Sequence, residues 1–326
     1  MKTPVVLTVF NRPGIVARVF SEIAKARPSK LYVIADGPRA NRPGEAENCA
    51  AARSVIERID WDCEVLRNYS DTNLGPRRRL STGINWVFEH EEEAIILEHD
   101  CLPHPTFFPF CEQLLAKYRN DQRVMHINGS NFLMGRVRMH DSYDFSRITH
   151  SWGFATWRRA WQFYDVDMKA WPALRNTSLV LDALMGNKQC AEYFTNVFDQ
   201  THSQLINTWD YQWLLTCWRL DGLSILPKTN LISNIGFGEE ALYCADINDL
   251  LANVPFHAMR FPLQHPLRVE VNREAEKFTI EHILMPNGRS KRGGFHKWLQ
   301  KIRKKLALRM RISRVLRMRM NRSVAD

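Results

Sequence analysis

The stretch Ala94-Ile-Ile-Leu-Glu98-His99-Asp100-Cys101-Leu-Pro-His-Pro105 decides the fold of this chain. Four apolar residues end abruptly in two acids that flank a histidine, and prolines follow. The pattern predicts a buried β-strand that carries carboxylates at its C-terminal end. In an open α/β sheet, ligands bind at that edge because the loops leaving the strands form a crevice there. Two oxygen ligands on a rigid strand end suit a hard divalent cation that also binds phosphates. The alternative is an ordinary acidic turn.

Strand and helix signals alternate outward from this stretch. Continuous apolar runs predict strands at residues 5–10, 31–35, 63–66, 94–97, 124–127 and 223–226. Apolar residues at helical spacing predict helices that begin at Pro13, lie around 52–59, span 75–90 and 107–118, and fill a block at 178–221. The β-α-β-α order of the first half predicts an α/β fold with a mainly parallel, doubly wound sheet.

Length and composition limit the class of protein. The 326 residues suffice for one large α/β domain and an appendage. Apolar residues at 45% and charged residues at 25% are ordinary globular values, so a substantial core is expected. Because no stretch approaches the roughly 18 to 20 apolar residues that span a bilayer, we expect a cytoplasmic protein. The seven cysteines are scattered and form no C-x-x-C pair, which indicates neither a disulfide framework nor a thiolate zinc site.

The net charge of +10 is concentrated at the C-terminus. From Arg289 onward there are 14 Lys and Arg residues against the single acid Asp326, so the tail carries +13 and the body −3. A globular nucleic-acid-binding domain is therefore not indicated, and no specific nucleic acid is expected as partner. Apolar residues at helical spacing among the basic ones predict an amphipathic helix within 289–322 that lies on an anionic membrane surface. RNA adhesion and a disordered basic tail remain alternatives.

Four segments, each at a predicted strand end or helix start, are similar to one enzyme family. They are Thr8-Val-Phe10-Asn11-Arg12, Asp36, Asn73-Leu-Gly75 and Glu98-His99-Asp100. In this order they resemble the GT-A fold glycosyltransferases, especially the inverting family 2 and N-acetylglucosaminyltransferase I kinds, over about residues 3–245. The resemblance implies that Thr8, Phe10, Asn11 and Arg12 contact a nucleotide and that Asp36 lies beside its base or ribose.

The resemblance also implies a metal-dependent donor site. Asp100 is expected to ligate Mn²⁺ or Mg²⁺, and Glu98 to orient it or hold a metal-bound water. His99 replaces an acid that usually contacts the ribose, although imidazole can also bond a ribose hydroxyl. Charge that develops on a leaving diphosphate needs fixed cations. Arg77, Arg78 and Arg79 are therefore candidates to reach the pyrophosphate, with a solvated helix face as the alternative.

On the acceptor side, the resemblance implies a carboxylate base at the start of a helix. Asp210 fits, since Trp213, Leu214 and Cys217 follow at +3, +4 and +7 and place it on the inward face. A helix-capping aspartate is the alternative. His150, Trp152 and Gly153 are expected to line a sugar pocket, because aromatic faces stack on sugars and glycine permits close approach.

Together these features predict a GT-A domain over 1–285, with a nucleotide-sugar-binding half at 1–127 and an acceptor-side half at 128–285, followed by a basic tail at 286–326. The expected activity is inverting transfer of a sugar from a nucleotide-diphosphate sugar to a hydroxyl of a glycan or lipid-linked acceptor, in bacterial surface polysaccharide synthesis at the inner face of the cytoplasmic membrane. A sugar nucleotidyltransferase is the alternative enzyme, although Thr8-Val-Phe-Asn-Arg-Pro13 lacks the glycines of its phosphate loop. A non-catalytic carbohydrate-binding or membrane-adaptor protein is the other alternative.

Overall fold

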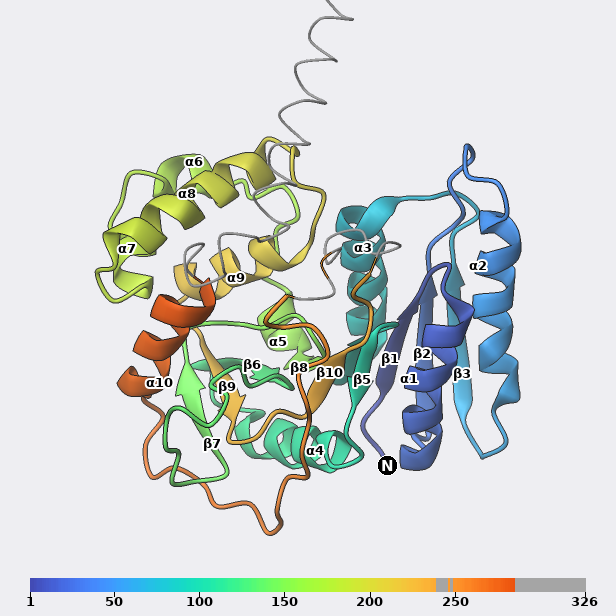
Figure 1. Ribbon diagram of the computed structural model, residues 1–326, viewed down its shortest axis with the longest axis horizontal. Helices are drawn as coiled ribbons and strands as arrows, with labels where there is room; N and C mark the ends of the chain where they lie inside the picture. Colours follow the sequence, from blue (N-terminus) through green and yellow to red (C-terminus); the bar gives the residue numbers. More distant parts are fainter. Residues whose placement is uncertain (239–245, 247–248, 285–326) are drawn as a thin grey trace, which may run out of the picture.

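An eight-stranded sheet forms the centre of the molecule (Figure 1). The computed structural model describes residues 1–238, 246 and 249–284. In spatial order the strands are β3 (Glu64–Tyr69), β2 (Lys30–Ala35), β1 (Val5–Val9), β4 (Glu93–Glu98), β8 (Phe154–Trp157), β6 (Val124–Asn128), β9 (Leu223–Pro227) and β7 (Tyr143–Ser146). Only β8 and β7 run against the common direction. The predicted α/β fold with a mostly parallel sheet is thus confirmed.

Helices cover both faces of the sheet and extend beyond its end (Figure 1). In the first half they are α1 (Pro13–Ala26), α2 (Glu45–Ser54), a 3-10 turn η1 (Val55–Arg58), α3 (Gly75–His90) and α4 (Phe107–Tyr118). In the second half they are α5 (Arg158–Trp161), α6 (Trp171–Leu174), α7 (Leu179–Ala183), α8 (Lys188–His202), α9 (Asp210–Arg219), α10 (Arg273–Phe278) and a π-helix η2 (Thr279–Leu284).

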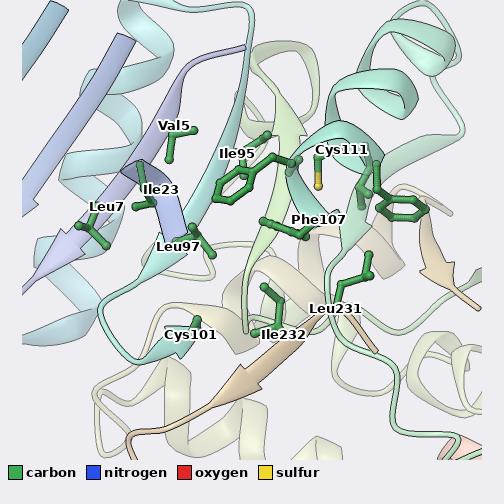
Figure 2. Close-up of a cluster of buried hydrophobic side chains, with 14 of the residues drawn as sticks. Val5, Leu7, Ile23, Ile95, Leu97, Cys101, Phe107, Cys111, Leu231 and Ile232 are labelled. Atoms are coloured by element: carbon green, nitrogen blue, oxygen red, sulfur yellow. The ribbon is translucent and has the colours of Figure 1, made fainter. Parts of the chain in front are cut away.

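Two apolar layers hold these helices to the sheet. On one face, the side chains of β1 and β4 pack against α1 and α4, as Figure 2 shows for Leu7, Ile23, Leu97 and Phe107. On the other face, α3 and α9 contribute Ile84 and Trp213 among other buried residues. β1 and β4 are buried on both faces, which explains why each reads as a continuous apolar run.

A third apolar cluster joins α6, α7 and α8 to α9, beside one end of the sheet (Figure 1). It includes Trp171, Phe198 and Trp218, all almost fully buried. Such large aromatic surfaces stabilise a helical layer that has no sheet beneath it. This layer fixes the position of α9, whose first residue is Asp210.

Four short strands were not predicted. β7 and β8 are four residues long, and β5 (Cys101–Pro103) pairs with β10 (Ile232–Asn234) over three residues. Their residues alternate poorly because aromatic and polar groups on both faces are buried, so period alone does not reveal them. The pairing of β5 with β10 brings residues 232–235 against the segment that follows β4.

The remaining expectations fall partly outside the described residues. The basic tail at 286–326 lies outside them entirely. Within the described ranges, no helix combines the length and apolar character that crossing a bilayer requires. The six described cysteines are free, at positions 49, 63, 101, 111, 190 and 217. The proposed division at residue 127 remains a prediction.

Candidate functional site

A cavity of about 570 Å³ opens where β1, β2 and β4 end. In-register pairing sets Thr8 beside Glu98 and Val9 beside Ala35, so these three strands deliver their following loops to one edge. Its lining includes eleven of the residues selected from the sequence: Thr8, Phe10, Asn11, Arg12, Asp36, Arg79, Glu98, His99, Asp100, Trp152 and Asp210. The cavity has the size and the position expected of a ligand site in an open α/β sheet.

The loop after β1 forms one wall of this cavity. Arg12 ends the loop just before α1, and its Nη1 donates to the Gly236 carbonyl at 2.9 Å. Asn11 Nδ2 donates to Glu45, a buried carboxylate that also pairs with Arg39. The Arg39 guanidinium lies 5.5 Å from the centre of the Phe10 ring. Cations and an aromatic ring are therefore held on this wall by contacts within the protein.

Three acidic residues line the same cavity. Glu98 ends β4, Asp100 follows it by two residues, and Asp210 begins α9. Burial, and then the negative charges of Asp100 and Asp210, raise the pKa of Glu98 to about 8. The indole Nε1 of Trp209 donates to Glu98 at 3.3 Å and partly opposes this shift. Burial and the neighbouring acids thus disfavour the ionised form of Glu98, which a bound cation would favour.

The loop after β10 covers Asp100. Ile235 N donates to the Asp100 carbonyl at 2.9 Å. A side chain at Gly236 would collide with the Asp100 carboxylate, so glycine is needed for this close approach. His99 also lines the cavity, and burial together with the charge of Arg12 lowers its pKa. A neutral imidazole is the form that accepts or donates one hydrogen bond to a hydroxyl.

These residues could hold a divalent cation. Asp100 and Glu98 would supply oxygen ligands, and burial, followed by the charges of Asp100 and Asp210, raises the pKa of Glu98. Within the described ranges, no group of three or more His, Cys, Asp or Glu side chains has metal-binding geometry. One or two carboxylates, completed by phosphate oxygens of a ligand and by water, form the coordination that Mg²⁺ prefers. The donor set therefore fits a cation that binds together with a phosphate ligand.

Asp36 lines the cavity, but its carboxylate is already engaged. Its two oxygens accept hydrogen bonds from the backbone amides of Gly37, Leu74 and Gly75 and from the Asn73 side chain, at 2.9 to 3.0 Å. The Leu74 and Gly75 amides belong to the start of α3, where an anion is favoured. Asp36 thus fixes the start of α3 with both of its oxygens.

The arginines of α3 do not gather at the cavity. Arg77 is buried and donates to the carbonyls of Thr201 and Val166 and to Asp167, whereas Arg78 is exposed. Neither lines the cavity. Helical geometry explains this result, because three consecutive residues point in directions about 100° apart. Arg79 does line the cavity, and its Nη2 donates to the Asn68 carbonyl and side chain.

Asp210 lies in the wall between this cavity and a second, smaller one of about 180 Å³. Its carboxylate accepts a hydrogen bond from the Thr208 hydroxyl. Burial raises the pKa of Asp210, and hydrogen bonds from Thr208 and the backbone amides at the start of α9 act against it. A carboxylic side chain that lines two neighbouring cavities is a candidate to exchange a proton with a bound group.

The predicted sugar-pocket residues divide between lining and packing roles. Trp152 lines both cavities, and His150 lines the smaller one. Gly153 lines neither. Its φ is +59°, and an added Cβ would lie 2.6 Å from the Ile232 side chain. The sequence therefore needs glycine at this position for packing against β10 rather than for the approach of a ligand.

Several cavity residues carried no signal in the sequence. Tyr193 from α8 and Asn234 from β10 line the larger cavity although they are distant in sequence from every motif. Asn207 does so as well, and its side chain packs against Gly75. Trp209 and Tyr211 flank Asp210, so the aromatic character of that segment was the one available clue.

Comparisons with known proteins give only distant likenesses. No protein-family model matches the chain, and no curated protein matches it. A mannosyltransferase from Pyrobaculum calidifontis, solved with GDP-mannose and Mn²⁺, is 14% identical, with 67% of this chain and 70% of that chain covered and a TM-score of 0.39. A UTP-bound UGPase from Acinetobacter baumannii is 10% identical, with 50% and 77% covered and a TM-score of 0.30. An apo UDP-glucose pyrophosphorylase is 8% identical, with 72% and 93% covered and a TM-score of 0.35. The assignment of function therefore depends on the site itself.

Proposed function

We propose that the protein is a metal-dependent, inverting glycosyltransferase of GT-A type, which transfers a sugar from a nucleotide-diphosphate sugar to a hydroxyl of a glycan or lipid-linked acceptor. One observation carries the proposal. Asp210 lines two cavities that share six lining residues, and the larger of them is also lined by Glu98 and Asp100. A transferase needs this order of parts: a site for the leaving diphosphate, a base, and a place for the acceptor.

The larger cavity suits the donor. Phe10, Asn11 and Arg12 at the end of β1 would bind the nucleotide, as would His99 if it bonds a ribose hydroxyl. Asp100, with Glu98, would hold Mn²⁺ or Mg²⁺. When bound, such a cation supplies charge neutralisation for the diphosphate. Arg12 and Arg79 add fixed positive charge to the lining of the cavity.

Asp210 would act as the general base. Its carboxylate accepts the proton of the acceptor hydroxyl while the acceptor oxygen forms a bond to the anomeric carbon of the donor sugar. The bond from that carbon to the phosphate oxygen breaks, and the nucleoside diphosphate leaves with the electron pair. A single displacement inverts the anomeric configuration. The raised pKa of Asp210 makes it a stronger base than an exposed aspartate.

Replacement of this base tests the proposal. Asp210→Asn keeps the size of the side chain and its contact with Thr208, so we expect nucleotide binding to remain and turnover to fall by about 100-fold or more. The measurement combines a thermal-shift screen of UDP-glucose, GDP-mannose and their nucleoside diphosphates, with and without Mn²⁺, and assays of released nucleotide. Normal transfer by a folded Asp210→Asn protein would contradict the assignment. Release of pyrophosphate from a nucleoside triphosphate and a sugar 1-phosphate would favour a nucleotidyltransferase.

We also propose that the basic segment 289–322, which lies outside the described residues, holds the protein at the inner face of a bacterial cytoplasmic membrane. Each basic residue near an anionic surface contributes on the order of 1 kcal/mol, partly additive. We therefore expect the full chain to sediment with phosphatidylglycerol vesicles at low salt and to release at high salt. Equal sedimentation of a chain that ends at Gly288 would contradict this role.

A further inference from the structure

The smaller cavity has a composition quite different from that of the larger one. It lies between α8, α9, the 148–152 segment and η2. Aromatic and aliphatic side chains dominate its lining, which comprises Phe132, Ile148, Thr149, His150, Ser151, Trp152, Tyr193, Phe194, Trp209, Asp210, Tyr211, Trp213, Leu214, Leu251, Ile283 and Leu284. The two cavities share Ser151, Trp152, Tyr193, Trp209, Asp210 and Tyr211. A ligand in the smaller cavity would therefore lie directly beside the proposed base.

We propose that this cavity is the acceptor subsite and that it takes one uncharged pyranose ring, so that the enzyme glycosylates a neutral sugar and rejects its uronic acid or phosphorylated counterpart. The inference rests on the proposed function. It adds the substrate class of the acceptor.

The size of the cavity limits the part of the acceptor that enters it. Its volume is about 180 Å³. An engineered protein cavity of about 150 Å³ holds a single benzene ring. The subsite therefore accommodates one six-membered ring, and the remainder of a longer glycan extends outside it.

The walls of the cavity suit the apolar face of a sugar. Trp152 and Tyr193 line the cavity and are half-buried. The Trp152 ring is braced edge to face by Phe132 at 5.3 Å between ring centres and by Phe237 at 5.7 Å. Phe194 braces Tyr211 in the same manner at 6.4 Å. Held in place in this way, an aromatic surface binds a ring with little loss of side-chain entropy.

The charges around the cavity exclude an anionic acceptor. Among the described residues that line it there is neither lysine nor arginine. Burial lowers the pKa of His150 to about 4, so this imidazole is neutral at physiological pH. Asp210 is then the one acidic group of the described lining. A carboxylate or phosphate on the acceptor would lose its hydration without gaining a cation, and it would be repelled by Asp210.

Binding of matched sugar pairs tests the inference on the full chain. Each pair is a methyl hexopyranoside and its C6 carboxylate counterpart, taken from the gluco, galacto and manno series, with binding measured by saturation-transfer NMR in the presence of Mn²⁺ and UDP or GDP. We expect at least one hexoside to bind ten or more times as tightly as its uronide, with saturation transferred to the protons of one ring face. Equal or tighter binding of the uronides, or binding by no sugar of any pair, overturns the inference.

A variant of Thr149 provides the reciprocal test. Thr149 is half-buried, and it lines the smaller cavity but not the larger one. Thr149→Lys introduces the missing cation, so we expect the preference to shift toward the uronide by tenfold or more. Thr149→Val, which is close in size and uncharged, should retain the wild-type preference. An unchanged preference in a folded Thr149→Lys protein would contradict the electrostatic argument.

Nucleotide binding separates this inference from the proposed function. UDP and GDP are titrated calorimetrically into the same samples with Mn²⁺. If a nucleoside diphosphate binds and the sugar pairs are not distinguished, the acceptor inference alone fails. If neither nucleotide binds, the proposed function fails as well.

Discussion

The ends of β2 and β4 look alike in sequence and differ in what surrounds their acids. Each strand is an apolar run that stops at a carboxylate. Asp36, after β2, accepts four hydrogen bonds from backbone amides and an asparagine. Asp100, after β4, receives within the described residues only a weak contact from the Cys101 thiol, at 3.7 Å, to its carboxylate. Asp100 also lines the same cavity as Glu98 and Asp210, and its charge helps to raise the pKa of Glu98.

The difference separates a structural carboxylate from one available to a ligand. Hydrogen-bond donors of the protein engage both carboxylate oxygens of Asp36, which thereby stabilises the start of α3. At the end of β4, burial and neighbouring acids disfavour the ionised form of Glu98, and a bound cation would favour that form. Both strand ends carry an acid. The number of hydrogen bonds that the protein donates to that acid therefore distinguishes the strand end that we propose to bind a ligand.

The largest effect is expected at Asp100. Asp100→Asn removes the charge that would hold the cation, so we expect cation-dependent sugar transfer to fall by on the order of 100-fold or more. Steady-state assays over a range of Mn²⁺ concentrations measure this loss. Asp62→Asn, at an exposed position, is the matched control and should retain wild-type activity. Full activity of Asp100→Asn would remove the β4 end from the proposed site.

Asp36→Asn should act on stability. An amide cannot accept all four hydrogen bonds, and its NH₂ group would meet backbone donors, so the free energy of unfolding should fall by about 2 to 3 kcal/mol. Urea denaturation followed by circular dichroism measures the change, with the exposed Asp71→Asn as control. A variant as stable as wild type would mean that the contacts of Asp36 do not stabilise α3.

The pH dependence of cation binding should report on Glu98. Its pKa is raised to about 8, so below that pH a proton must leave before the carboxylate can contribute to cation binding. Apparent Mn²⁺ affinity in the presence of nucleotide should therefore decrease by roughly tenfold for each pH unit below 8. Glu98→Gln should bind more weakly at pH 8 and show a flatter profile. Parallel profiles for the two proteins would exclude a role for Glu98.

A smaller effect is expected at Glu276, whose protein donors are fewer than those of Asp36. It accepts from the Ser146 hydroxyl at 2.5 Å and from Arg147 N at 3.0 Å, and burial raises its pKa to about 6. Since the folded state binds the proton more tightly than the unfolded state, stability should decrease as pH rises from about 4.5 to 6 and stay lower above that range. The expected loss is about 1 to 2 kcal/mol. Urea denaturation between pH 4.5 and 7 should show this loss in wild type and not in Glu276→Gln, and equal slopes would contradict it.

The sequence sufficed for the six parallel strands of the sheet and for the position of the candidate site. Buried parallel strands read as apolar runs whether or not their partners are known, so β1, β2, β4 and the helices between them were predictable. The acids at the strand ends followed from the same patterns, whereas Asp210 was selected because the family resemblance implies an acid at a helix start. The pairing of β5 with β10 was not predictable, because it joins two three-residue segments about 130 residues apart.

The roles of individual polar residues depended on such distant contacts. The Arg77 guanidinium is a group that often binds phosphate, yet here it donates hydrogen bonds to the carbonyls of Thr201 and Val166. Gly153 resembled a ligand-approach glycine, and Ile232 from β10 explains it instead. Tyr193 enters the cavity from α8 because a separate apolar cluster positions that helix. These partners are distant in sequence, so the local sequence pattern does not predict them.

Direct measurement of bound Mn²⁺ tests the contrast between the two strand ends most directly. Electron paramagnetic resonance counts free Mn²⁺ as the protein is titrated in the presence of UDP or GDP, with wild type, Asp100→Asn and Asp36→Asn compared under conditions where circular dichroism shows each to be folded. We predict that wild type and Asp36→Asn each bind one Mn²⁺ per chain and that Asp100→Asn binds none at the same concentrations. Undiminished Mn²⁺ binding by Asp100→Asn, or its loss in Asp36→Asn alone, would contradict the account.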